Sequence, residues 1–112
     1  MADTVSEQIA ALSDEDWAIR EEAATLLGAL KDARAVLPLT KALRDSDRAV
    51  REAAVGALSS LGSVSVPALA GCLTDPDLQV QEAASAILAS LADARVLAPL
   101  TQALGSRDWI VR

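Results

Sequence analysis

The feature that most constrains this fold is a segment that recurs four times along the chain. Residues 47–54 carry its second copy and read DRAVREAA. The leading aspartates of successive copies lie 31, 30 and 31 residues apart, at Asp16, Asp47, Asp77 and Asp108. A period of this length indicates an array of similar supersecondary units, each packed on its neighbours. Positions related by one repeat are called a column below.

The apolar residues of each copy follow the periodicity of an α-helix. They fall at i, i+4, i+7, i+8 and i+11, which is one face of a helix. Three copies share these positions, so the prediction does not depend on the propensities of any one copy. The apolar positions are Ile19, Ala23, Leu26, Leu27 and Leu30, then Val50, Ala54, Ala57, Leu58 and Leu61, then Val80, Ala84, Ile87, Leu88 and Leu91.

A shorter apolar pattern follows each of these helices, after a break at residues 31–32, 62–63 or 92–93. Its spacing of +3 and +7 predicts a second helix in each unit. Proline near the start of each suits a first turn, where the missing N–H has no partner to lose. The second helices carry Val36, Leu39 and Leu43, then Val66, Leu69 and Leu73, then Leu97, Leu100 and Leu104.

The chain is therefore expected to be a single all-α domain, residues 1–112, built from helical hairpins. It begins with a half-repeat at residues 4–12, because Val5 and Leu12 share the columns of Val36 and Leu43. Thr4 and Glu7 read as a capping box at its start. Full repeats are expected at about 13–43, 44–73 and 74–104, with a truncated fourth at 105–112.

Composition narrows the function classes. The chain has no His, Tyr or Phe and only two Trp, so its core consists mainly of Ala, Leu and Val, which suits closely packed helices better than strands. A net charge of −6, with basic residues interleaved among acids, argues against nucleic-acid binding. Without His or Tyr, catalysis has few groups to use, and we expect no enzyme and no cofactor.

The N-terminus and the cysteine content predict a cytoplasmic chain. Residues 1–4 lack the basic region and apolar run of a signal peptide. Cys72 is the sole cysteine, which excludes an internal disulfide. No uncharged apolar stretch approaches the roughly 20 residues that span a bilayer, so we expect no membrane partner.

Two segments carry a resemblance to a known family. Residues 32–43 read DARAVxPLxxAL and residues 43–54 read LxDxDxxVRxAA. This pattern, repeated with variation over residues 12–112, resembles the short HEAT-like repeat of the phycobilisome-lyase type. The resemblance implies a right-handed α-α superhelix (an α-solenoid) that acts as a binding scaffold. It also implies that first helices line the convex face and second helices the concave face.

Two polar columns are interpreted as structural. Asp16, Asp47, Asp77 and Asp108 stand where a helix N-cap is required, and this favours capping over a metal site. Arg20, Arg51 and Arg112 share a column in which Gln81 is the exception. We expect these side chains to pair with aspartates of the adjacent turns rather than to bind anions. The aspartates in question are Asp14, Asp45 and Asp75.

Three further residues have open interpretations. Cys72 shares the column of Ala42 and Ala103, which favours an inert packing thiol over a nucleophile. Trp17 and Trp109 share a column with Arg48 and Leu78, so it is expected to be partly exposed. An indole there is either a binding anchor or a cover for the end of the solenoid, with cover favoured for Trp17.

Partner contact is expected at the outward positions of the second helices, which vary from copy to copy while the core columns stay apolar. Drift on a solvated face produces the same variation. Gly71 is unusual there because a glycine within a helix costs about 1 kcal/mol against alanine, so it is a candidate for close approach by a partner or a helix. The candidates are Arg34, Leu37, Lys41, Arg44, Pro67, Gly71, Arg95, Ala98, Gln102 and Trp109.

These observations predict a non-enzymatic protein-interaction scaffold with a protein partner. We expect it to be a fragment of a longer array, or to self-associate through its uncapped C-terminal end at Ile110 and Val111. The alternative that the resemblance permits is a bilin-lyase-like subunit or chromophore-binding chaperone, with an open-chain tetrapyrrole in the concave groove. A designed repeat is a third interpretation, which the irregular copies disfavour.

Overall fold

The computed structural model describes residues 3–104 of the chain, with side chains for residues 3–93. Within these bounds the chain consists of helices joined by short turns and contains no strand, so the all-α prediction is confirmed. The helices are α1 (Thr4–Ala11), α2 (Trp17–Leu30), α3 (Val36–Ala42), α4 (Arg48–Leu61), α5 (Val66–Cys72) and α6 (Leu78–Leu104), with the 3-10 helices η1 (Ala33–Ala35) and η2 (Gly62–Ser65).

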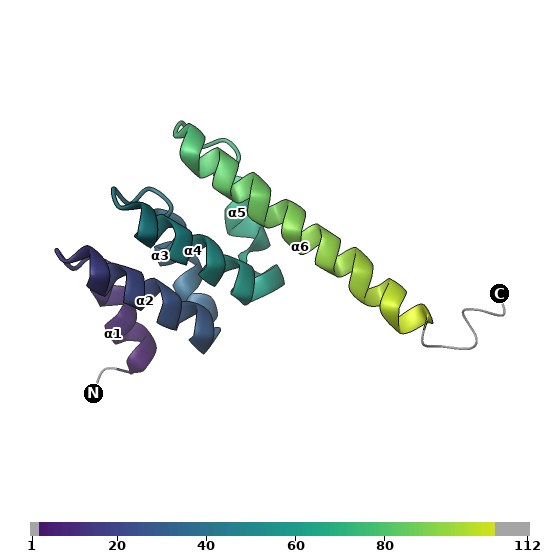
Figure 1. Cartoon of the computed structure of the whole chain (residues 1–112), viewed down its shortest axis with the longest axis horizontal. Helices are drawn as coiled ribbons and strands as arrows, with labels where there is room; N and C mark the ends of the chain where they lie inside the picture. Colours follow the sequence, from purple (N-terminus) through teal and green to yellow (C-terminus); the bar gives the residue numbers. More distant parts are fainter. Residues whose placement is uncertain (1–2, 105–112) are drawn as a thin grey trace.

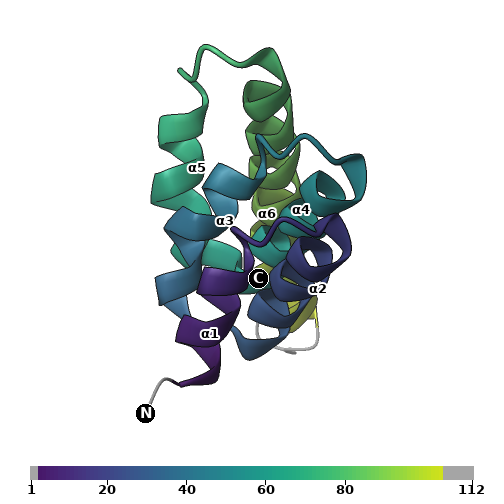
Figure 2. The same ribbon diagram turned by 90° about the vertical axis from the view of Figure 1, so that its left-hand side faces the viewer.

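The helices form two layers. Figure 2 shows α1, α3 and α5 in one layer, here called the second-helix layer, and α2, α4 and α6 in the other, the first-helix layer. Along the chain the two layers alternate, so that each helix follows one of the opposite layer (Figure 1). This is the expected stack of helical hairpins, in which the two layers share one core.

The core lies between the layers and follows the predicted columns in the middle of the stack. Val50, Ala54 and Leu58 of α4 are fully buried, as are Leu39 of α3 and Leu69 of α5. Small residues between larger ones let neighbouring helices interdigitate without voids. Aliphatic side chains, mainly of Ala, Leu and Val, therefore build this core, and no aromatic side chain is among its buried residues in the described part of the chain.

The first copy departs from the pattern, because three of its five apolar positions are exposed. Ile19, Leu26 and Leu30 are exposed on α2. α4 buries these positions against the helix before it, α2. Within the described chain no helix precedes α2 in its layer, so the same face of α2 has no neighbour. The columns predict which face is apolar, but the neighbour decides whether it is buried.

A glycine sets the distance between α2 and α4. A Cβ placed on Gly28 would lie 2.7 Å from the Cα of Ala57 and 2.9 Å from its Cβ. Real Cβ atoms do not approach backbone atoms so closely, so only glycine fits in α2 at this point. The two helices consequently pack along most of their length.

The third repeat also differs from its prediction, because α6 is one helix of 27 residues. The break expected at residues 92–93 is not formed, and residues 97–104 continue α6. In the same column the first two breaks adopt positive φ, at Lys31 with 53° and Gly62 with 70°. Ala92 occupies this position in the third repeat, and alanine favours helix and disfavours the left-handed region. The repeat boundary at residue 104 stays a prediction.

Helix starts mostly follow the sequence. Asp16 and Asp47 cap α2 and α4, as predicted. The first helix is capped by Asp3 rather than Thr4, with the Asp3 carboxylate accepting from the N–H of Ser6. A carboxylate at the N-cap also suits the helix dipole, which explains why Asp3 is used although a hydroxyl follows it.

One stretch, Arg48–Cys72, is long and apolar enough to cross a membrane by length and composition, with a mean hydropathy of 1.5. The structure divides it into α4, η2 and α5. Gly62, at the C-terminus of α4, turns the chain back into the other layer. Neither helix alone reaches the roughly 20 residues that a transmembrane helix requires.

Candidate functional site

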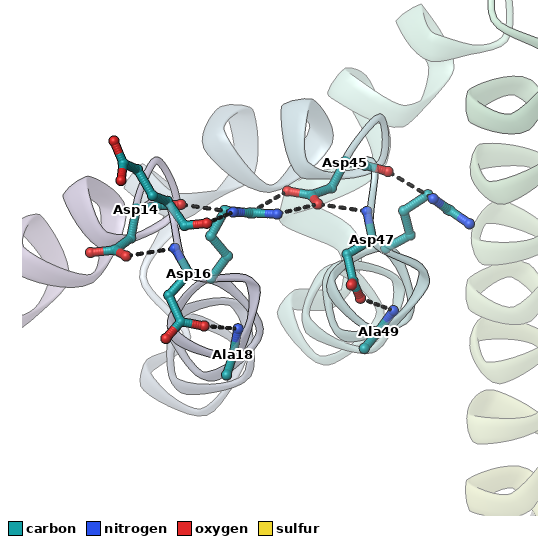
Figure 3. Close-up of polar contacts among 9 residues, drawn as sticks. Asp14, Asp16, Ala18, Asp45, Asp47 and Ala49 are labelled. Atoms are coloured by element: carbon teal, nitrogen blue, oxygen red, sulfur yellow. Dashed lines mark hydrogen bonds and ion pairs between the residues drawn. The ribbon is translucent and has the colours of Figure 1, made fainter.

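The repeated aspartates build the turns between units. In the first turn the Asp14 carboxylate accepts from the N–H of Asp16 at 2.8 Å, and the Asp16 carboxylate accepts from the N–H of Ala18 at 2.9 Å (Figure 3). Asp45 and Asp47 repeat this arrangement in the second turn (Figure 3), and Asp75 and Asp77 repeat it in the third. Each pair therefore satisfies two backbone N–H groups at a helix start. Asp108 lies outside the described residues.

Arg20 joins the first turn to the second. Its guanidinium donates to both carboxylate oxygens of Asp45, at 2.8 and 3.1 Å, and to the backbone carbonyls of Asp14 and Glu15 (Figure 3). This hydrogen bonding to Asp45 raises the pKa of Arg20. Burial raises the pKa of Asp45, but the hydrogen bonds from Arg20 and from the Asp47 N–H outweigh it and leave that pKa below its ordinary value.

A second contact of the Arg20 column, to a backbone carbonyl of the preceding turn, is present in all three described copies. Arg20, Arg51 and Gln81 each donate to the carbonyl of the residue six positions earlier, which is Asp14, Asp45 or Asp75. Gln81 therefore retains the bond within its own repeat. Arg20 makes the predicted link to the next repeat, whereas the carboxylate of Asp75 pairs with Arg44 instead of Arg51.

Two predicted partner-binding residues are occupied by contacts between repeats. Arg34 pairs with Asp32 at 2.9 Å and with Asp3 at 3.0 Å. The hydrogen bonds from Arg34 lower the pKa of Asp32, and the Ser6 N–H together with Arg34 lowers the pKa of Asp3. Arg44 pairs with Asp75, whose side chain is buried. In both inter-repeat pairs the partners lie 31 residues apart, one repeat length. That spacing was the signal in the sequence that could have revealed them.

A groove of about 250 Å³ lies between α1 and α3, and of its seven lining residues four are apolar and two are charged. Ile9 lies in α1, Leu12 directly follows α1, and Pro38 lies in α3. Lys41 stands at the edge, exposed, and no carboxylate of the described residues forms an ion pair with it. Asp45, which also lines the groove, is engaged by Arg20. The groove thus offers an apolar floor beside one available cation.

The other described candidates share this outward surface. Leu37 is 66% exposed on α3, and Pro67 and Gly71 are exposed on α5. A Cβ added to Gly71 would meet no atom within 4 Å, so the expected close approach of a neighbouring helix is wrong. The side chains of Arg95, Ala98, Gln102 and Trp109 lie outside those that the structure describes.

The remaining candidates are Trp17, Cys72 and possible metal ligands, and none of them forms a defined site in the described residues. Trp17 is about half exposed at the start of α2, so its predicted covering role is at most partial. Cys72 is half-buried at the end of α5. Among the described residues no group of three potential metal ligands lies together.

A second groove lies in the first-helix layer between α2 and α4. Its volume is about 330 Å³, and Gly28, Ala57 and Ser60 are among the residues that line it. Its walls are small side chains and backbone, a consequence of the close approach at Gly28. It lacks a charged side chain, and packing alone accounts for it.

These features define the class of protein as a solenoid of paired helices, linked by aspartate turns with a period of about 31 residues. The chain belongs to the HEAT repeat family, whose model matches residues 5–86. No curated protein matches it. HEAT repeats generally serve as protein-interaction scaffolds and typically lack enzymatic activity.

A solved structure similar to this chain is the crystal structure of an engineered protein, with a TM-score of 0.54 and 25% sequence identity. The match covers 79% of this chain and 45% of that protein. The chain therefore spans less than half the length of this relative. The likeness supports the helical-repeat architecture.

Proposed function

We propose that this chain is a non-enzymatic protein-interaction scaffold whose partner lies on the outward face of α1, α3 and α5, here called the second-helix face. The groove beside Lys41 is the observation that carries the proposal. Of the charged candidates with described side chains, Lys41 alone has no ion-pair partner among the described residues, whereas Arg34 and Arg44 hold repeats together. Leu37 projects from the same helix.

The chemistry of the groove favours a particular kind of ligand. An aliphatic side chain would bury against Ile9, Leu12 and Pro38, and an acidic group beside it would meet Lys41. Burying one such aliphatic side chain contributes about 1.5–3 kcal/mol. The preferred partner is therefore a peptide segment in which an apolar anchor stands next to a carboxylate.

Selection of binders from a displayed library of random peptides tests this proposal. Peptides that bind the wild-type chain should carry the apolar–acidic pairing. Two matched variants then locate the contact, because Leu37 and Leu78 are almost equally exposed, at 66% and 64%, on opposite layers. Leu37→Asp should weaken binding at least about tenfold, equivalent to 1.4 kcal/mol. Leu78→Asp should leave it nearly unchanged.

Loss of binding with Leu78→Asp but not with Leu37→Asp would contradict the proposal, and so would equal losses with both. Lys41→Glu adds a test of charge. This substitution should weaken the binding of peptides that contain the carboxylate. It should leave unchanged the binding of versions in which an amide replaces the carboxylate.

The bilin-binding alternative stays a prediction. The groove of about 250 Å³ is smaller than the 300–1,000 Å³ typical of small-molecule pockets, and an open-chain tetrapyrrole is a large ligand. Absorbance after incubation with a bilin distinguishes the two functions, because a bound chromophore shifts its spectrum.

A further inference from the structure

One end of the stack exposes an apolar face that the repeat buries elsewhere. Ile19 of α2 is 41% exposed, whereas Val50 of α4 and Val80 of α6, in the same column, are 0% exposed. Leu26 is exposed in a column where Ala57 and Ile87 are buried. In α4 and α6 these columns face the preceding helix of the layer. The face of α2 that carries Ile19 and Leu26, here called the front of α2, therefore has the character of a helix–helix interface but no described helix packs on it.

The other end shows the same mismatch in the second-helix layer. Leu73, which follows α5, is 43% exposed, whereas Leu43, which follows α3, is 1% exposed. Within the described residues α6 runs to Leu104 without turning back, so no described helix lies beyond α5 in that layer (Figure 1). Leu73 therefore lacks the neighbour that α5 provides for Leu43.

The chain itself contains the two elements that fit these surfaces. α1 belongs to the second-helix layer, and its Val5 and the Leu12 that directly follows it repeat the columns of Val36 and Leu43. The outward side of α6 carries Ser85, Leu88 and Ala89 in the columns of Ala24, Leu27 and Gly28, the α2 residues that are buried where α4 packs. Ser85 and Ala89 are exposed, and Leu88 is half-buried.

We propose that a second copy of this chain docks head to tail on the first, with α5 and α6 of one copy against α1 and α2 of the next. The order of layers supports this occupant, since α1 to α6 form three alternating pairs and α1 of the next copy continues the alternation. A single docking event then covers both the front of α2 and Leu73. The contact is heterologous, so it leaves one free end of each kind and extends to short chains of copies.

The charges at this junction predict how it responds to salt. Within the chain Arg20 reaches Asp45 of the next turn, but in α6 the same column holds Gln81, so the corresponding link to Asp14 of the next copy is uncharged. The junction rests on apolar contact between two copies that each carry a net charge of −6. Added salt screens their repulsion and should strengthen association.

Sedimentation velocity over a range of concentrations tests the proposal with three lysine variants. The wild-type chain should associate reversibly, and more so at higher salt. Leu26→Lys disables the α2 end and Leu73→Lys disables the α5 end, so each variant alone should be a monomer. Mixing the two should give a 1:1 dimer and nothing larger. The Leu26→Lys variant keeps an unaltered α5 end and the Leu73→Lys variant keeps an unaltered α2 end, so only one junction can form. Leu37→Lys, on the second-helix face, should associate like the wild type.

Several outcomes would overturn the inference. A wild-type chain that stays monomeric at all concentrations would show that the exposed ends are covered within one copy or left bare. A failure of the mixed variants to form the dimer, with each variant helical by circular dichroism, would exclude a heterologous junction. Disruption by Leu37→Lys would place self-association on the second-helix face instead.

Discussion

Gly28 shows how one residue sets the spacing of two repeats. Its missing Cβ lets α2 lie against Ala57 of α4. At the next junction the same two columns hold Ser59 and Ile87, which are both larger. α4 and α6 accordingly pack along less of their length than α2 and α4 do. The columns mark Gly28 as an interface position only once the neighbouring helix is in place.

The first prediction compares glycines within helices. Gly28→Ala should destabilise the fold, because overpacking costs about 1–3 kcal/mol and exceeds the gain of about 1 kcal/mol in helix propensity. Gly56→Ala is the matched control, since a Cβ there meets nothing within 4 Å. It should stabilise the protein by about 0.5–1 kcal/mol. Urea unfolding measures both, and equal effects of the two substitutions would contradict the close contact.

The second prediction concerns Asp45, whose pKa is lowered in the folded state. A lowered pKa adds stability that is fully present above the unfolded value of about 3.9 and disappears as pH falls through the folded value. Asp45→Asn should therefore cost about 1 kcal/mol at neutral pH. The difference from the wild type should shrink below about pH 4.

Urea unfolding across a pH series checks this, with Glu22→Gln as the control because Glu22 is an exposed carboxylate on α2. The control should change stability little at any pH. A difference between Asp45→Asn and wild type that is independent of pH would show that the carboxylate charge contributes nothing.

Residue-level prediction from the sequence succeeded where the interaction is local. The capping roles of Asp16, Asp47 and Asp77 depend on backbone groups two residues away, and the repeat makes them readable. The choice of Arg44 rather than Arg51 as the partner of Asp75 depends on how two turns meet in space. Helical periodicity does not encode that geometry.

At the scale of elements, the helices of the first two repeats follow the sequence and the third does not. α2 and α4 each have 14 residues and end where the backbone takes a positive φ, at Lys31 and Gly62. In the third repeat Ala92 lies inside α6. An apolar pattern with helical spacing before and after a break is compatible with one helix or with two, so the residue at the break decides.

The third prediction changes that residue. Ala92→Gly should interrupt α6, because it places glycine in the column where Gly62 ends α4 and costs a continuous helix about 1 kcal/mol. Spin labels at Glu82→Cys and Gln102→Cys, in a Cys72→Ala background, report the geometry. Twenty residues of continuous helix place the label sites about 30 Å apart. The glycine variant should add a population at shorter distance, and an unchanged distance distribution would contradict the role of Ala92.

At the scale of the whole molecule, we assign different roles to the two helix layers and to the ends of the stack. The aspartate turns and arginine links hold the repeats together. The second-helix face of this frame carries the groove, Leu37 and Lys41. Periodicity predicted the frame and the outward positions. It could not identify the exposed front of α2, because a column looks the same whether or not a neighbour covers it.

The most direct test of this division is amide hydrogen exchange of the chain alone and with a bound library-selected peptide. We predict new protection in α1 and α3 around the groove, with α2 and α4 unchanged on their outward sides. New protection confined to α2 and α4 would contradict it and would place recognition on the first-helix layer.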